Sequence, residues 1–121
     1  MSYDNNNIFA KILRGEIPCD KIYEDEYVLS FYDINPQRKI HALVIPKGKY
    51  IDLDDFNSKA SDKEIVGLLK GISIVAKKLC ISVDKGKGYR TLSNLSEDGG
   101  QEVPHLHFHL FGGERVGKMV Q

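Results

Sequence analysis

The 121-residue chain has no excess of either charge, no long apolar run and only two cysteines. Its 17 basic residues balance its 17 acidic residues, so no long-range field would attract nucleic acid or an anionic membrane. No apolar run approaches the roughly 18 residues of a membrane span, and the N-terminus does not resemble a signal peptide. We therefore expect no nucleic-acid partner, no membrane partner, and a cytoplasmic location that could extend to the nucleus.

The cysteines indicate the redox compartment. Cys19 and Cys80 lie far apart and form no CxxC pair. One disulfide between them is compatible with the sequence, but without a sign of secretion reduced thiols are favoured. The length fits one domain spanning residues 1–121, and 41% hydrophobic with 28% charged residues is typical of globular proteins.

Local patterns predict helices at two places and strands at several others. The apolar spacing predicts a short helix over residues 8–13, capped by residues 5–7 and ended by Gly15. The capping box "SDKE" at residues 61–64 predicts a long helix that runs to Leu79. Strand-like segments are residues 20–25, 27–33, 40–46, 88–94 and 105–110. This order indicates an α+β domain, in which hairpin-connected strands favour an antiparallel sheet.

Two features near the long helix have plain interpretations. The acidic cluster Asp52, Asp54 and Asp55 is interpreted as a solvated connection. Gly67 and Gly71, inside the helix, each cost about 1 kcal/mol relative to alanine. They indicate either simple tolerance or the close approach of another backbone.

Three of the four histidines stand at alternate positions in the segment "HLHFHLFGG", residues 105–113. Because a strand sends successive side chains to opposite faces, we expect His105, His107 and His109 in a row on one face. The apolar residues between them then lie on the other face.

Three interpretations of this row remain open from the residues alone. The histidines could be hydrogen-bonded structural residues on a half-buried sheet. Two of them and His41 could bind a metal, whereas the outer pair, roughly 13 Å apart, could not readily share one ion with the third. In the third interpretation, neutral His107 attacks a phosphorus atom while a cationic flanking histidine donates to the phosphate oxygens.

The segment "EDGGQ", just upstream of the histidines, supports the third interpretation. Two glycines let backbone N–H groups approach an anion closely, as in a backbone nest. An ordinary turn would explain the same glycines, so this signal gains its weight from its position beside the histidines.

Several segments of the sequence, including the histidine row, resemble a known family. "HLHFHLF" matches the His-φ-His-φ-His-φ-φ signature of the histidine triad (HIT) superfamily, where φ is apolar. "IFAKILRGEIPCDKIYEDE", "FYDINPQRKIHALVIPKG" and "GGQEVPHLHFHLFGG" resemble its Hint branch, the purine nucleoside phosphoramidases, and the likeness extends over residues 8–113. It implies a five-stranded antiparallel sheet with two helices, and a homodimer with a continuous sheet and the long helix at the interface.

The resemblance also implies an activity, the hydrolysis of purine nucleoside 5′-phosphoramidates to AMP or GMP and an amine through a nucleotidyl-histidine. No cofactor and no metal are implied. His107 matches the nucleophile, His109 the residue that contacts the phosphate and assists proton transfer, and His105 the residue that orients the nucleophile. His41 matches a histidine near the triad, and Asp33 the carboxylate that holds the ribose hydroxyls.

Further positions match the nucleotide pocket of the family. The apolar walls around the purine correspond to Phe9, Ile12, Phe31 and Ile34, with Tyr32 contributing mainly its backbone. The phosphate-side loop corresponds to Asn94, Gly100, Gln101 and Val103.

One position departs from the family pattern. Glu102 stands where better-known Hint proteins have a serine whose hydroxyl reaches the leaving group or phosphate. A carboxylate there would repel phosphate unless it turned toward a cationic amine or accepted from a histidine, so the leaving-group preference stays open. The alternative functions are a dinucleoside polyphosphate hydrolase of the same superfamily and a zinc- or nucleotide-binding regulatory protein.

Overall fold

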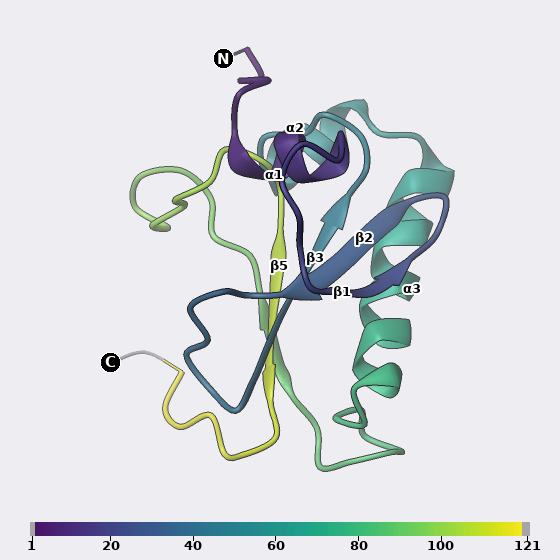
Figure 1. Ribbon diagram of the computed structural model, residues 1–121, viewed down its shortest axis with the longest axis vertical. Coiled ribbons are helices and arrows are strands. Elements are labelled where there is room, and N and C mark those ends of the chain that lie inside the picture. Colours follow the sequence, from purple (N-terminus) through teal and green to yellow (C-terminus); the bar gives the residue numbers. More distant parts are fainter. Residues whose placement is uncertain (1, 120–121) are drawn as a thin grey trace.

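A computed structural model of the chain describes residues 2–119, which form three helices and five strands (Figure 1). The helices are α1 (Ile8–Leu13), α2 (Leu53–Lys59) and α3 (Asp62–Lys78). The strands are β1 (Lys21–Glu24), β2 (Val28–Tyr32), β3 (Ile40–Pro46), β4 (Arg90–Leu92) and β5 (Phe108–Gly112). They form one antiparallel sheet in the order β1-β2-β3-β5-β4. The predicted fold class is confirmed.

The capping signals in the sequence determine where two helices begin. Asn7 caps α1 by accepting from the backbone N–H of Ala10, and Gly15 follows the helix with a φ of 78°. Ser61 and Glu64 form a complete capping box at the start of α3. Both helices therefore begin where the sequence predicts.

The structure differs most from the sequence-based prediction at the acidic cluster Asp52, Asp54 and Asp55. Asp52 is the N-cap of α2, and its side chain accepts from the backbone N–H of Asp55. Asp55 also accepts from the N–H of Ile51 and pairs with Lys59 one turn later. The segment interpreted as a solvated connection is thus a short third helix, anchored by the buried Phe56.

The two faces of the sheet are covered differently. Val44 and Leu110 lie in the core beneath α3, which runs along one face in Figure 1. Leu43 and Phe31 face the other way and pack with Phe9 of α1. Because α1 is only six residues long, it covers only part of this second face. His41 of β3 and His109 of β5 lie on this same face.

Two predictions about the cysteines and the membrane can be compared with this structure. Cys19 and Cys80 are free thiols. Among residues 2–119, no helix is long and apolar enough to span a bilayer.

The helix glycines serve packing within the chain. A Cβ added to Gly67 would lie 2.5 Å from the Tyr27 ring, and one added to Gly71 would lie 2.9 Å from the Val28 side chain. These distances are too short for ordinary contacts. Of the two interpretations of Gly67 and Gly71, simple tolerance does not fit these distances, and the close approach is made by side chains of β2 and the residue before it, not by another backbone.

Gly67→Ala tests this packing because two effects oppose each other. Alanine would add about 1 kcal/mol of helix propensity, whereas displacing the body of the Tyr27 ring should cost about 1–3 kcal/mol. We expect a net loss in the free energy of unfolding, measured by urea denaturation. The exposed control Lys70→Ala should change it little. A Gly67→Ala protein more stable than the wild type would contradict this packing account.

Candidate active site

The histidines of the "HLHFHLF" segment are not all in a strand. His109 lies in β5, directly opposite Leu43 of β3, and so shares the face partly covered by α1. His105 and His107 precede the strand, where the chain bends: the N–H of His105 bonds to the carbonyl of Val103 at 2.8 Å. The prediction of three histidines in one strand is therefore wrong at its first two members. His107 and His109 still lie together, with ring centroids 5.1 Å apart.

A hydrogen bond at Nδ1 determines which ring nitrogen of His107 carries the proton. Its Nδ1 lies 2.7 Å from the backbone carbonyl of His105. A carbonyl oxygen can only accept, so Nδ1 carries the proton and Nε2 carries the lone pair. Phe9 of α1 packs edge-on against the ring at a centroid distance of 5.0 Å. Backbone and aromatic contacts together fix both the tautomer and the orientation of His107.

His105 is fully buried and bonded at both nitrogens. Nε2 lies 2.9 Å from the carbonyl of Pro46 at the end of β3, so Nε2 carries the proton. Nδ1 is then an acceptor, and the hydroxyl of Tyr3 donates to it. His105 therefore orients His107 through its backbone carbonyl, while its own ring is fixed by other segments.

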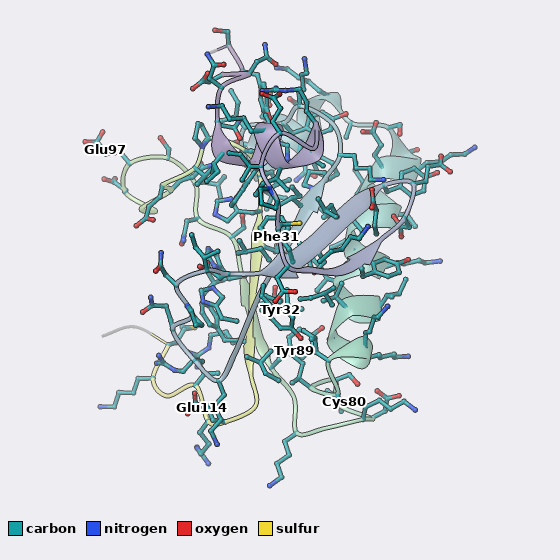
Figure 2. The ribbon with its side chains drawn as sticks, in the orientation of Figure 1. Phe31, Tyr32, Cys80, Tyr89, Glu97 and Glu114 are labelled. Carbon is teal, nitrogen blue, oxygen red and sulfur yellow. The ribbon has the colours of Figure 1, made fainter. Side chains whose placement is uncertain are left out.

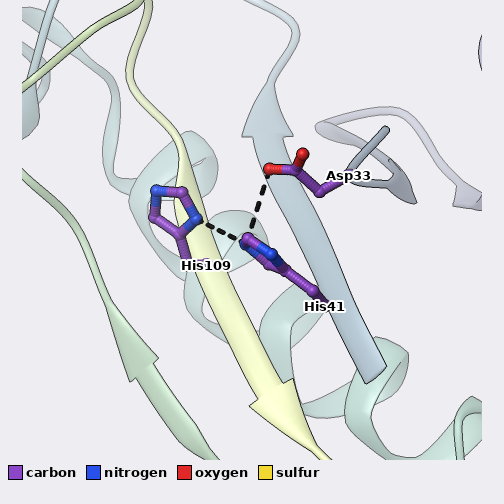
Figure 3. Close-up of side chains that lie close together, drawn as sticks. All are labelled: Asp33, His41 and His109. Atoms are coloured by element: carbon purple, nitrogen blue, oxygen red, sulfur yellow. Dashed lines mark hydrogen bonds and ion pairs between the residues drawn. The ribbon is translucent and has the colours of Figure 1, made fainter. Parts of the chain in front are cut away.

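His41 and His109 form a second pair, shown in Figure 3. The backbone N–H of Gln37 donates to Nδ1 of His41 at 3.1 Å, so the proton of a neutral His41 is on Nε2. Nε2 lies 2.9 Å from Nδ1 of His109 and 3.5 Å from a carboxylate oxygen of Asp33. His109 thus accepts at Nδ1 and keeps its proton on Nε2, available to donate to a ligand.

Burial keeps these imidazoles neutral. It is the main cause that lowers the pKa of His105 and of His109 to about 4, with repulsion from neighbouring histidines adding to it. Burial also lowers the pKa of His107 and of His41, although the negative charge of Asp33 works in the opposite direction. A cationic flanking histidine, expected from the sequence, is therefore not the state of the free protein at neutral pH.

The residues assigned to the purine pocket divide into two groups. Phe9 and Phe31 are buried and pack edge-to-face at 5.5 Å, and half-buried Ile12 packs against the same cluster. Tyr32 and Ile34 are exposed, at 39% and 87% of their surface. Figure 2 labels Phe31 and Tyr32, consecutive residues of β2 whose side chains take opposite faces. Phe9 thus packs against His107 from the aromatic cluster, whereas Tyr32 is exposed on the opposite face of the sheet.

The glycine loop before the histidines is folded on itself. The N–H groups of Gly99, Gly100 and Gln101 bond to carbonyls of residues 95–97 of the same loop. A Cβ at Gly99 would lie 2.3 Å from a carbonyl oxygen, and Gly100 has a φ of 73°. The glycines are needed for this compact turn. The predicted anion nest made by their N–H groups is therefore wrong.

Gln101 connects the loop to its surroundings. Its side-chain oxygen accepts from the N–H of Ser96, and its side-chain nitrogen donates to the carbonyls of Ile51 and Val103. The amide group expected to contact phosphate is thus engaged in positioning the loop. Asn94 follows β4 and is half-buried, as is Val103.

Glu102 is exposed, and its negative charge is one of the influences that act to raise the pKa of His107. The departure from the family pattern therefore adds a negative charge whose field reaches His107. A negative charge there opposes an approaching phosphate and favours an approaching cation.

Three residues that support the histidines have no distinguishing signal in the sequence. The hydroxyl of Ser93 donates to the carbonyl of His107 at 2.7 Å, Gln37 donates through its backbone, and Tyr3 reaches His105 from the N-terminus. Each contact joins segments distant along the chain or uses a main-chain group, so local patterns do not reveal it.

Asp33, His41 and His109 are the residues that come nearest to a metal site in the described part of the chain, with ligand atoms within 4.8 Å of one another. They do not fit a metal ion. A metal at Nε2 of His41 would move the ring proton to Nδ1, where the N–H of Gln37 already donates. Two protons would then face each other across that contact.

Comparisons with known proteins agree on the family. The HIT domain pattern matches residues 14–116. A HIT-like protein of Azospirillum brasilense is 54% identical over 98% of this chain and 95% of its own length. A HIT-like protein of Helicobacter pylori is 49% identical over 90% of this chain and 98% of its own length. A structure titled as a HIT family hydrolase from Clostridium thermocellum superposes with a TM-score of 0.85 at 36% identity, covering 98% of this chain and 99% of that one.

The lowered histidine pKa values predict a pH-dependent stability. In the unfolded chain these groups titrate near 6.5, whereas folded His105 and His109 titrate at about 4. The unfolded state therefore binds more protons between these values. Their contribution is fully present above pH 6.5 and falls as the pH drops toward 4, by at most about 1.4 kcal/mol per pH unit per histidine.

Urea unfolding at pH 7.0 and 5.5 measures this slope in a range where carboxyl groups titrate little. We expect a lower free energy of unfolding at pH 5.5, and a smaller difference for His109→Gln. Equal stability of the wild type at the two pH values would show that the histidines are not buried as neutral groups.

Proposed function

The chain belongs to the HIT domain family, and on that premise we propose that it hydrolyses purine nucleoside 5′-phosphoramidates through a nucleotidyl-histidine. The fold is that of HIT family hydrolases. The finer assignment, a phosphoramidase of the Hint type, is supported by the resemblance of the sequence and by the state of His107.

The observation that carries the proposal is the bond from Nδ1 of His107 to the carbonyl of His105. With the proton fixed on Nδ1, the lone pair of Nε2 can attack phosphorus without first losing a proton. The attack makes the ring cationic, and the N–H bond to the carbonyl then becomes charge-assisted and stronger. The site thus stabilises the charge that develops on the nucleophile.

The proposed reaction has two displacements. The Nε2–phosphorus bond of His107 forms as the phosphorus–nitrogen bond to the amine breaks, and the amine takes up a proton from solvent water. Water then attacks phosphorus, its oxygen replaces Nε2, and its surplus proton is released. Over the cycle one water supplies hydroxyl to phosphorus and hydrogen to the amine. His109 donates a hydrogen bond from its Nε2–H to the phosphoryl group or the leaving nitrogen, in the orientation fixed by His41, and keeps that proton.

The nucleoside part is proposed to lie over the face that α1 leaves open. Asp33 accepts from the N–H of Asn35 with one oxygen, and its other oxygen, 3.5 Å from Nε2 of His41, is proposed to accept from a ribose hydroxyl as well. Purine contacts are assigned to the apolar residues around Phe31, and phosphate contacts to the loop between Asn94 and Val103. No metal takes part. The free thiols support the cytoplasm as the proposed location.

A turnover assay with chelator separates this function from its alternatives. Adenosine 5′-phosphoramidate should be hydrolysed with EDTA present and faster than diadenosine polyphosphates. Preference for the polyphosphates would favour a dinucleoside polyphosphate hydrolase. Loss of binding or activity with EDTA would favour a zinc-dependent protein, and AMP binding without turnover of any phosphoramidate would favour a regulatory one.

His107→Ala tests the nucleophile. We expect turnover to fall at least about a thousandfold, and the covalent nucleotidyl adduct seen by intact-protein mass spectrometry to disappear. In His107→Gly, added imidazole should restore part of the activity because it fills the vacated space. Normal turnover by His107→Ala would end this mechanism.

We also propose that the protein works as a homodimer that pairs through α3. Val66 and Leu69 are 49% and 59% exposed on the side of α3 turned away from the core. Light scattering should give the mass of two chains for the wild type and of one for Leu69→Lys. The control Val83→Lys, at an exposed apolar residue outside the helix, should remain dimeric. A monomeric wild type at micromolar concentration would contradict the proposal.

A further inference from the structure

The segment before α1 is anchored so that Tyr3 reaches the histidines. The N–H and the side-chain amide of Asn7 both donate to the carbonyl of Asp4, at 3.2 and 2.7 Å. Asn7 is itself buried and caps α1. In Figure 1 this helix lies near the upper end of β5, so the turn over residues 4–7 is fixed to the same end of the sheet as the histidines.

Tyr3 completes the hydrogen bonding of His105. Its hydroxyl lies 2.5 Å from Nδ1, and the two rings meet edge-on at 5.6 Å. Because Nε2 of His105 carries the proton that bonds to the carbonyl of Pro46, the direction of the second bond is fixed. Tyr3 donates and His105 accepts. Burial raises the pKa of Tyr3 further above its ordinary value, so the hydroxyl keeps its proton at neutral pH.

We propose that Tyr3 is a positioning residue for the nucleophile, acting on His107 through His105. His105 is 0% exposed, so without the hydroxyl its Nδ1 would be a buried acceptor lacking this donor. Its ring would then be free to turn and to break the bond to Pro46. The carbonyl of His105 is the group that holds Nδ1 of His107, and a shift of that carbonyl misaligns Nε2.

This inference rests on the proposed function for its kinetic consequence, but the geometry stands independently. A small displacement of a reacting atom lowers the rate of the chemical step and leaves contacts with the nucleoside intact. Tyr3 touches none of the residues assigned to ribose or phosphate in the described contacts; its hydroxyl interacts with His105 and with the side chain of Asn7 in the same N-terminal turn. The predicted effect is therefore on kcat and not on KM.

Tyr3→Phe with a matched control tests the proposal. It removes one hydroxyl and keeps the aromatic ring. Tyr23→Phe removes a hydroxyl that bonds Asp25 at 2.7 Å on β1, away from the histidines. With adenosine 5′-phosphoramidate we expect kcat of Tyr3→Phe to fall by roughly ten- to a hundredfold, with KM within about twofold. Tyr23→Phe should match the wild type in both. Unchanged kcat for Tyr3→Phe, or a rise in KM alone, would overturn the proposal.

A second measurement needs no turnover and so separates failure of this inference from failure of the proposed function. In the proton NMR spectrum of the wild type, the Tyr3 hydroxyl should give a downfield, slowly exchanging signal that is absent from Tyr3→Phe and kept in Tyr23→Phe. If that signal is present while no phosphoramidate is hydrolysed, the function is wrong and the positioning contact stands. If the folded wild type shows no such signal, the contact is wrong.

Discussion

The bond from Nδ1 of His107 to the carbonyl of His105 is the interaction on which the site depends. At 2.7 Å and buried, it decides which nitrogen carries the proton and which carries the lone pair. The bend at residues 103–107 places the carbonyl of His105, Phe9 packs edge-on against the ring of His107, and Ser93 donates to the carbonyl of His107. The fold therefore prepares a neutral nucleophile by means of backbone and aromatic contacts.

Hydrogen bonds fix the position of the ring proton in all four histidines. Each has at least one nitrogen matched to a donor or an acceptor: backbone groups fix the tautomers of His41, His105 and His107, and the ring of His41 fixes that of His109. Burial lowers their pKa values, so the arrangement remains neutral in the physiological range. In the proposed reaction the phosphate group brings negative charge, and the attack makes the His107 ring cationic. The preoriented hydrogen-bonding groups then stabilise the charge that develops during the reaction.

Sequence patterns predict the structural features that depend on neighbouring residues within one segment. The capping box at Ser61 and the alternation around His109 lie within single segments, and both identified their elements. The sequence-based prediction is wrong where one residue type has two different structural roles. Aspartates solvate loops and also cap helices, as Asp52 does, and paired glycines make anion nests as well as compact turns, as Gly100 does. Contacts between distant segments, such as Tyr3 with His105, needed the folded chain. The pocket roles of Asp33 and its neighbours stay predictions.

The most direct test is the protonation of the His107 ring, read from long-range nitrogen–proton correlations in NMR spectra at pH 7. The account predicts a signal pattern with the proton on Nδ1 and a bare Nε2. A proton on Nε2, or a doubly protonated ring, would contradict it, because the atom assigned to attack phosphorus would then have no lone pair to offer.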